Sequence, residues 1–247
     1  MMESTLETWW CRPSDWRSKS VAERSLELLD EPEMGRYRRF AFDEDRARFL
    51  VAHGLKRRVL EHHTGIDARE WTFVKGEHGR PEPSGESSAR GLRFNISHTE
   101  GLVACVVHGM QDCGIDVEYR NRRASLEPLM RRCFTPEERQ WIGTGVEERR
   151  RFFQLWTLKE AYIKARGMGM ALPLQGFWFA DPQANDGRLG FGAKSEIEAS
   201  VQPWFFEIRD IGEEHQMALA SRFVDGVAPS VRYREPQPGD FQHPVRS

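Results

Sequence analysis

The chain has 247 residues, of which 39% are hydrophobic and 30% are charged. Its 36 Lys and Arg residues nearly balance its 38 Asp and Glu residues, which excludes a disordered chain and any global cationic field for coating nucleic acid. A mean hydropathy of −0.64, short apolar runs and an N-terminus unlike a signal peptide predict no membrane segment. The four cysteines lack zinc spacing and suit reduced thiols, so we expect a globular cytoplasmic protein that binds neither membrane nor nucleic acid.

The predicted elements are a few long helices separated by short strands. Apolar residues at helical spacing predict one helix over 43–60 and another over 149–166, and the capping sequence Thr135-Pro136 predicts a third that begins there. Runs of β-branched and aromatic residues predict strands over 71–74, 92–96, 102–107, 113–119, 177–179, 204–208 and 217–222. Gly, Pro and Ser predict a loop over 76–91, and a polar, Pro-rich composition predicts a poorly ordered tail over 229–247.

The two long helices share a faint internal repeat. Arg48-Phe49 followed by Leu55-Lys56 matches Arg151-Phe152 followed by Leu158-Lys159 at the same offset, and an aromatic strand follows each helix. Chance similarity between two amphipathic helices explains such a match as well as duplication does. Duplication would give two related α+β halves, joined near residues 109–114, with a ligand site in the cleft between them.

A first candidate site lies on the predicted strand 113–119. Side chains alternate along a strand, so Asp116 and Glu118 project from one face and Ile115 and Val117 from the other. Two carboxylates in this arrangement can share a hard divalent cation such as Mg²⁺. A strand with one solvated face explains the same pattern.

A second candidate site lies on the predicted helix 149–166. Apolar residues cover most of its circumference, and Glu160 and Lys164 fall on a narrow polar stripe with Thr157. Charges on a mostly buried helix need partners, because an unpaired buried charge is costly. A simple Glu–Lys ion pair one turn apart on the helix is the alternative.

A third candidate site is the pair Ser97-His98, which ends a predicted strand at a turn. Both side chains can donate hydrogen bonds to phosphate oxygens. A nucleophilic Ser with a His base is a poor explanation, because adjacent residues rarely point at each other and no GxSxG elbow is present. A plain turn remains the other interpretation.

Taken together, the blocks 94–98 (FNISH), 114–118 (GIDVE) and 156–161 (WTLKEA) resemble the three signature blocks of the 4′-phosphopantetheinyl transferases in sequence, order and spacing. The resemblance spans about residues 36–179, and the length is similar to that of the monomeric, pseudo-duplicated branch. It implies an α+β fold of two similar subdomains related by a pseudo-twofold axis. Each would be a small, mainly antiparallel sheet packed on a long helix, with the active site in the cleft between them. The boundaries would be 1–112 for the N-terminal half and 113–228 for the C-terminal half, followed by the tail.

The resemblance implies a reaction between coenzyme A and an apo acyl, peptidyl or aryl carrier protein. A serine hydroxyl of the carrier attacks the β-phosphorus of the coenzyme, and the products are the holo carrier and 3′,5′-ADP. The metal would be Mg²⁺, or Mn²⁺ in its place. Asp116, Glu118 and Glu160 resemble the family's metal-binding carboxylates, and Lys164 resembles its phosphate-contacting catalytic lysine. Within the family the general base is either the helix glutamate or a water on the metal, and we assign Glu160 as the base.

The remaining roles concern the phosphates and the carrier. Ser97 and His98 resemble donors to the phosphates of coenzyme A, Arg80 resembles the basic residue of a G-[KR]-P turn beside the 3′-phosphoadenosine, and Arg48 resembles another 3′-phosphate contact. A run of arginines after the metal strand is a candidate patch for an acidic carrier, or else a solvated loop: Arg120, Arg122, Arg123, Arg131 and Arg132. The competing functions are a metal-dependent phosphodiester hydrolase that uses the same carboxylates and a non-catalytic module that binds coenzyme A or a carrier.

Overall fold

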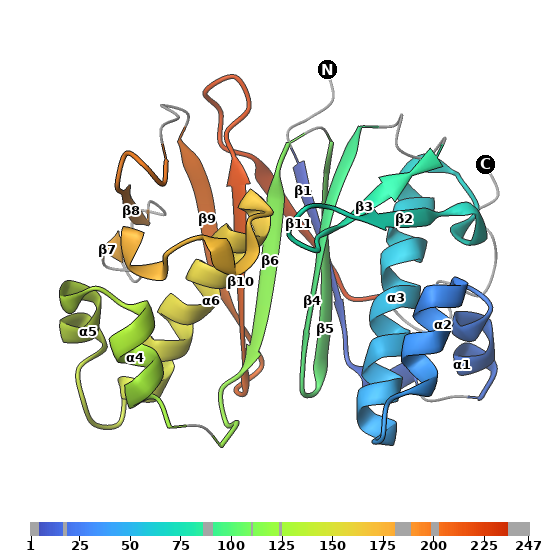
Figure 1. Cartoon of the computed structure of the whole chain (residues 1–247), viewed down its shortest axis with the longest axis horizontal. Coiled ribbons are helices and arrows are strands. Elements are labelled where there is room, and N and C mark those ends of the chain that lie inside the picture. The colour runs from blue at the N-terminus through green and yellow to red at the C-terminus, as the bar shows by residue number, and fades with distance from the viewer. Residues whose placement is uncertain are drawn as a thin grey trace.

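The computed structural model describes residues 5–16, 19–85, 91–109, 111–123, 125–180, 189–198 and 203–236 (Figure 1). Two sheets carry the site, each with a long helix beside it. The first sheet has the strand order β11-β1-β5-β4, in which β1, β5 and β4 are antiparallel and β11 is parallel to β1. Its strands are β1 (Thr5–Cys11), β4 (Leu92–Thr99), β5 (Leu102–Gly109) and β11 (Ser230–Arg234).

The second sheet is antiparallel, with the order β6-β10-β9. Its strands are β6 (Cys113–Tyr119), β9 (Trp204–Ile211) and β10 (His215–Arg222). Two short hairpins complete the strands, one near each long helix. They are formed by β2 (Thr72–Lys75) with β3 (Pro81–Ser84), and by β7 (Phe177–Ala180) with β8 (Gly190–Ala193).

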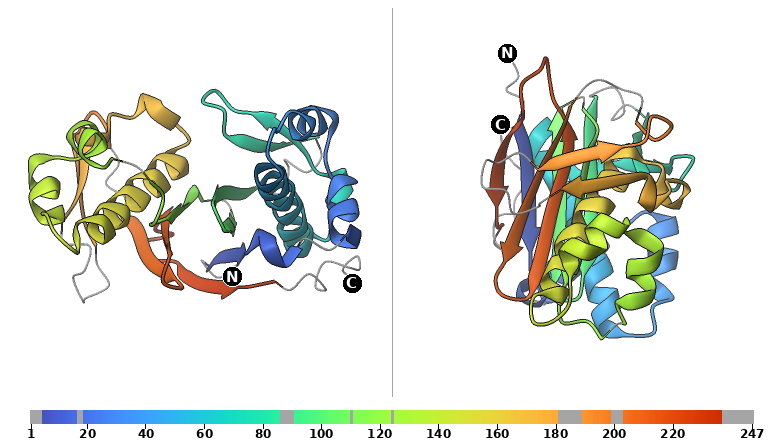
Figure 2. Two further views of the ribbon diagram at one scale, coloured as in Figure 1. Left: turned by 90° about the horizontal axis from the view of Figure 1, so that it is seen from below. Right: turned by 90° about the vertical axis from the view of Figure 1, so that its left-hand side faces the viewer.

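The long helices α3 (Asp43–Thr64) and α6 (Glu148–Arg166) lie on opposite sides of the strands, as the left view of Figure 2 shows. Each ends at a glycine in the left-handed region, Gly65 and Gly167, which closes the last turn without strain. Shorter helices pack around them: α1 (Lys19–Leu26), α2 (Glu31–Arg38), α4 (Glu127–Cys133) and α5 (Pro136–Ile142).

Three apolar cores hold these layers together. One joins α3 to the first sheet, one joins α6 to the second sheet, and one lies between the two sheets. The strand β5 is buried along almost its whole length because its two faces belong to different cores. Its residues toward α3 are Val103, Cys105 and Val107. Its residues in the core between the sheets are Leu102, Ala104 and Val106.

Strands β4 and β6 join the two sheets through side chains instead of a backbone ladder. Alternate residues of β4, namely Asn95, Ser97 and Thr99, accept hydrogen bonds from backbone N–H groups of β6 at distances of 3.1, 3.2 and 3.2 Å. The donors are Ile115, Val117 and Tyr119. This side-chain seam satisfies the edge of β6 and fixes its register against β4.

The strand β6 also lies unusually close to α6. A Cβ atom added at Gly114 would stand 2.1 Å from the carbonyl oxygen of Ala161 and 2.4 Å from the backbone nitrogen of Ala165. Only glycine fits such an approach without moving the helix or the strand. The glycine that opens the block 114–118 therefore sets the distance between the carboxylates of β6 and the polar side chains of α6.

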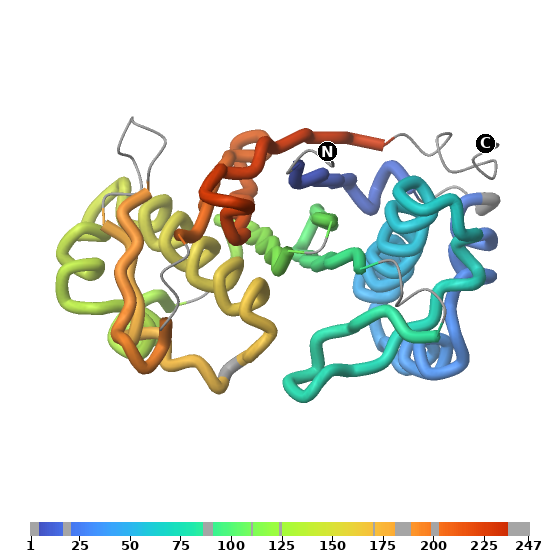
Figure 3. Tube along the Cα trace, turned by 90° about the horizontal axis from the view of Figure 1, so that it is seen from above, coloured from blue at the N-terminus to red at the C-terminus, as the bar shows by residue number. Residues whose placement is uncertain are grey.

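The predicted helices and strands are confirmed, and two predictions about irregular segments are wrong. The loop predicted over 76–91 contains β3, and residues 86–90 lie outside the described part. The poorly ordered tail predicted over 229–247 contains β11, which pairs with β1, while residues 237–247 lie outside the described part. Figure 3 shows β11, in red, crossing from the side of α6 to lie beside β1. The described helices include none that is long and apolar enough to cross a membrane.

Candidate active site

Asp116 and Glu118 project from one face of β6 toward α6, as their alternation predicts, and their exposed fractions are 4% and 9%. The Oδ1 atom of Asp116 accepts hydrogen bonds from Lys164 Nζ at 2.7 Å and from Ser97 Oγ at 3.0 Å. Its Oδ2 atom is buried and has no hydrogen-bond partner. A buried carboxylate oxygen without a donor is costly, so this atom is a natural ligand for a cation.

Both oxygens of Glu118 have partners. Trp156 of α6 donates from Nε1 to Oε1 at 2.6 Å, and Arg122 approaches Oε2 at 3.1 Å. Burial, and then the nearby charge of Asp116, raise the pKa of Glu118 to about 7. The two carboxylates of β6 therefore oppose each other's ionisation, and a cation between them would relieve that repulsion.

Glu160 belongs to the same electrostatic group. Burial, and then the charge of Asp116, raise the pKa of its carboxyl group. Within the residues that the structure describes, however, no group of three or more His, Cys, Asp or Glu side chains is arranged to hold a metal ion. The charge of Asp116 thus acts on both Glu118 and Glu160, but the three carboxylates are not assembled as a finished metal centre. Three carboxylates, one of them with a buried oxygen that lacks a hydrogen-bond partner, fit a divalent cation such as Mg²⁺.

Lys164 of α6 contacts side chains from both β6 and β4. Its Nζ atom donates to Asp116 and to Ser97 Oγ, the latter at 2.8 Å, so it bridges α6, β6 and β4. The hydroxyl of Ser97 already donates its only proton to Asp116 and accepts from Lys164 and from the N–H of Val117. Ser97 is therefore placed to orient Asp116, and a phosphate could receive its proton only after that bond is broken.

Two large cavities meet at Lys164. One, of about 860 Å³, lies between α4, α6 and the β2–β3 hairpin and has an apolar wall that includes Leu129, Ile163 and Leu172. The other, of about 850 Å³, lies toward α2 and α3 and is rich in charged side chains. Both are lined by Gly79, Pro81, Ile96 and Lys164. The cationic residues of the second cavity are Arg36, Arg39, Lys56, Lys75, Arg122 and Lys164, and its acidic residues are Asp30, Glu33, Asp116 and Glu118.

His98 lies on the wall of the cavity rich in charges. Desolvation, and then the charges of Arg48 and Lys164, lower the pKa of His98 to about 4. The imidazole is therefore neutral at pH 7 in the free protein, although its ring is exposed to the cavity. Arg48 is near enough to act on His98, but its guanidinium is paired with Asp45 and it does not line the cavity.

Arg80 makes contacts that its sequence context does not reveal. Its NH1 atom donates to the carbonyl of Ala165 at 3.1 Å, and its NH2 atom donates to the carbonyl of Phe94 at 3.3 Å. The side chain thus ties the tip of the β2–β3 hairpin to the end of α6 and to β4. It borders the apolar cavity and is absent from the lining of the charged one.

The arginine run after β6 does not form the continuous patch that was expected. Arg120 is 9% exposed, pairs with Asp210 at 3.0 Å and donates to the carbonyl of Glu213. Arg122 pairs with Glu118, and Arg131 pairs with Glu127 at 2.7 Å. Interpreting all five arginines as a carrier-facing patch is therefore wrong for Arg120, which faces the protein.

Sequence reasoning missed several residues of the site. Trp156 holds Glu118 and falls one helical turn before Glu160, so the i,i+4 spacing within WTLKEA was a signal for it. Asn95, inside FNISH, anchors β6 from β4. Arg36 and Arg39 line the charged cavity from α2 or its end, a region for which no helix was predicted.

Comparison with known proteins agrees with this geometry. The family model described as the 4′-phosphopantetheinyl transferase superfamily matches residues 112–220, and the model described as the 4′-phosphopantetheinyl transferase N-terminal region matches residues 9–109. The chain is 34% identical over 164 residues to the 4′-phosphopantetheinyl transferase HetI of Nostoc sp. This alignment covers 66% of this chain and 69% of HetI. It is 29% identical over 249 residues to a phosphopantetheinyl transferase of Thraustochytrium sp., covering 94% of this chain and 84% of that protein.

The match to the 4′-phosphopantetheinyl transferase Sfp of Bacillus subtilis is 28% identical and covers 84% of this chain and 88% of Sfp. The two family models adjoin at the boundary between β5 and β6. Together they cover both long helices and the strands of both sheets except β11, the start of β1 and the end of β10. These matches confirm the resemblance carried by the three sequence blocks, and the chain belongs to the 4′-phosphopantetheinyl transferase superfamily.

Proposed function

We propose that the protein transfers the 4′-phosphopantetheine group of coenzyme A to a serine of an apo acyl, peptidyl or aryl carrier protein and releases 3′,5′-ADP. The observation that carries the proposal is the position of Lys164, at the junction of a cationic and an apolar cavity and 2.7 Å from Asp116. Coenzyme A has a highly charged nucleotide end and a neutral arm, joined by a pyrophosphate. The two cavities match these ends, and the junction matches the pyrophosphate.

Each side chain then has a physical task. Lys164 neutralises the pyrophosphate, and the cations of the α2–α3 cavity hold the 3′-phosphorylated nucleotide. The apolar wall of the other cavity holds the neutral arm and excludes water from the reacting phosphorus, which suppresses hydrolysis. Positioning and charge stabilisation are what phosphoryl transfer mainly requires of a protein.

Asp116, Glu118 and Glu160 would hold Mg²⁺, as the unpaired oxygen of Asp116 and the mutual repulsion of these carboxylates support. When bound, the ion withdraws charge from the pyrophosphate and stabilises the leaving group. Glu160, a carboxylate of α6 that lines the apolar cavity beside Lys164, is the candidate for accepting the proton of the carrier serine. Its raised pKa favours that role, whereas use of its lone pairs by the ion opposes it.

We also propose that the fold consists of two related halves, 1–112 and 113–228, with the site between them. The matching features support it: α3 and α6 occupy corresponding positions beside their sheets, and a hairpin follows each helix. The buried lysines Lys56 and Lys159, which the sequence repeat aligns, both pair with a glutamate from the capping box of a short preceding helix. We also propose that the protein acts as a monomer, as its resemblance to the pseudo-duplicated branch implies.

The decisive experiment is to incubate the protein with coenzyme A, Mg²⁺ and a panel of apo carriers and to measure carrier masses. Transfer predicts a gain of one phosphopantetheinyl group on the carrier and release of 3′,5′-ADP. A hydrolase would cleave coenzyme A without modifying any carrier. A non-catalytic module would bind coenzyme A in calorimetry without turnover.

We predict that Glu160→Gln lowers activity through the metal before it affects proton transfer. The variant should bind Mg²⁺ on the order of 10–100-fold more weakly, the usual range for groups that support a metal site. Excess Mg²⁺ should then partly restore turnover, which a titration of rate against Mg²⁺ concentration would measure. If the Mg²⁺ affinity is unchanged and no excess restores activity, Glu160 acts as the base instead.

We predict that binding of coenzyme A is coupled to protonation of His98. A phosphate beside the ring raises its pKa from about 4, so the complex binds more protons than the free protein and affinity rises as the pH falls from 7 toward 5. Calorimetry without Mg²⁺, in buffers of different ionisation enthalpy, measures this proton uptake. The uptake should be smaller in His98→Gln, and an equal uptake in both proteins would remove His98 from the phosphate site.

A further inference from the structure

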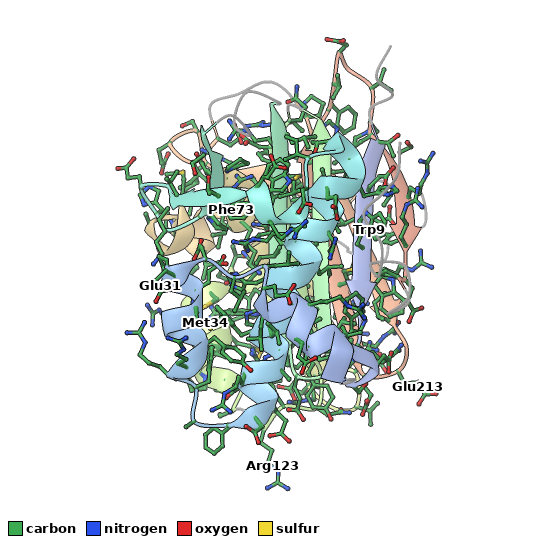
Figure 4. All side chains as sticks on the ribbon, turned by 90° about the vertical axis from the view of Figure 1, so that its right-hand side faces the viewer. Trp9, Glu31, Met34, Phe73, Arg123 and Glu213 are labelled. Carbon is green, nitrogen blue, oxygen red and sulfur yellow. The ribbon has the colours of Figure 1, made fainter. Side chains whose placement is uncertain are left out.

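Helix α2 has only weak apolar packing, because its apolar side chains Met34 and Tyr37 are half-buried. None of its side chains, from Glu31 to Arg38, is buried, yet it lies beside α3, as Figure 4 shows for the part that carries Glu31 and Met34. Most surface helices are fixed by an apolar face, and that of α2 is small. Its charged contacts therefore contribute to its position.

Two carboxylates tie the start of α2 to α3: Asp30, which lies 3.6 Å from NH2 of Arg57, and Glu33, which has more partners. Glu33 accepts from Nδ1 of His53 at 2.7 Å, pairs with Nζ of Lys56 at 3.0 Å and with NH2 of Arg57 at 2.7 Å. Lys56 and Arg57 are each 1% exposed. Because buried cations of this kind are costly without a counterion, they hold Glu33 firmly in place. Glu33 also completes the capping box with Asp30, so the same side chain defines where the helix begins.

The fixed position of Glu33 determines where the arginines of this segment point. Arg36 follows Glu33 by three residues, and Arg39 is the C-cap of α2, so both depend on the helix that Glu33 anchors. Both line the charged cavity, as do Glu33 itself, His98 and Lys164, so the test must separate an effect through Arg36 from a direct one. Arg36 also lies over the ring of Phe49 in α3, 5.4 Å from its centroid, which limits its motion.

We propose that Glu33 is a positioning residue for the anionic end of the substrate: it anchors α2 so that Arg36 and Arg39 face the phosphate-bearing cavity. This inference rests on the proposed function. The C-terminal half contains the same arrangement, in which Glu138 of the α5 capping box pairs with the buried Lys159 of α6 at 2.8 Å. No side chain of α5 lines either large cavity. The pairing of a capping-box glutamate with a buried lysine therefore bears on binding only in the N-terminal half.

The test compares Glu33→Gln with Glu31→Gln, which changes an exposed carboxylate of the same helix outside the cavity. With a carrier that the wild-type protein modifies, Glu33→Gln should raise the KM for coenzyme A about tenfold or more while kcat stays within about twofold. Glu31→Gln should match the wild type. Wild-type turnover tests the proposed function separately, so absence of any transfer is distinct from failure of this inference.

A double-mutant cycle with Arg36→Ala separates positioning from a general loss of structure. If Glu33 acts through Arg36, the double variant should raise KM little beyond the larger single effect, because the two changes remove the same interaction. Effects that multiply, or a KM equal to that of the wild type in Glu33→Gln, would overturn the inference. If Glu33→Gln does not fold, Glu33→Asp replaces it in the same cycle, because it keeps the counterion of Lys56 and Arg57 on a shorter side chain.

Discussion

Asp116→Asn should reduce carrier modification by about a thousandfold, because the substitution removes the charge of the carboxylate with the unpaired oxygen. A divalent ion at a phosphoryl centre supplies several kcal/mol of charge stabilisation, and about 4 kcal/mol corresponds to three orders of magnitude in rate. Asparagine preserves the shape and still accepts from Lys164 and Ser97 at Oδ1, so the loss isolates the charge. Steady-state kinetics and Mg²⁺ titration of the variant measure it.

The same substitution should lower the pKa values of the neighbouring carboxyl groups. The charge of Asp116 contributes to the raised pKa values of Glu118 and Glu160, so both should fall toward their ordinary range in Asp116→Asn. Carboxyl carbon chemical shifts followed against pH would report this change. Asp210→Asn is a suitable control, because Asp210 pairs with Arg120 outside both cavities. Activity retained in Asp116→Asn with Mg²⁺ dependence intact would exclude this carboxylate as a metal ligand.

Lys159→Met should lower the free energy of unfolding by about 3–5 kcal/mol, because it leaves a buried carboxylate without its partner. Lys159 is fully buried, and its Nζ lies 2.8 Å from Oε2 of Glu138 and also donates to the carbonyls of Leu174 and Phe177. Glu138 in turn accepts from the N–H of Phe179 in β7. The pair thus joins α5, α6 and the hairpin β7–β8, and thermal or urea unfolding of the variant measures its contribution.

The matched double variant Lys159→Met/Glu138→Leu should lose much less stability than the sum of the two single variants. Removing both charges avoids an uncompensated buried ion, and the remaining cost is the loss of the backbone hydrogen bonds that the two side chains made. Lys194→Met changes an exposed lysine on the same half and serves as a control with little expected effect. Additive losses in the double variant would show that Lys159 and Glu138 contribute independently.

The elements that the sequence predicts best are those in which apolar and polar residues alternate with a regular period. The long helices have apolar residues at regular spacing, and β6 alternates carboxylates with Ile115 and Val117, so their position and the shared face of Asp116 and Glu118 follow directly. The resemblance also assigns Ser97, Asp116 and Lys164 to one site. In the structure these three side chains contact one another at 2.7–3.0 Å.

Other features depend on contacts that no local pattern contains. Helix α2 is short and buries no side chain, so it has no periodicity, and only the capping pair Asp30 and Glu33 marks it. The strand β11 lies among prolines and gains its structure from β1. The role of Arg80 depends on carbonyls of α6 and β4 that are distant in sequence. In each case tertiary pairing overrides the local composition.

The pairing of β11 with β1 also governs the order of folding during synthesis. Thr5 and Ser230 are partners across a separation of 225 residues. At ribosomal rates of about 5–20 residues per second, β1 waits roughly 10–45 s before its parallel neighbour emerges. Until then the nascent chain exposes an open β-edge beside a completed helix, a surface that other chains can pair with. Recombinant production should therefore favour conditions that slow aggregation, and fusions placed after residue 236 should carry a flexible spacer so that β11 can reach its partner.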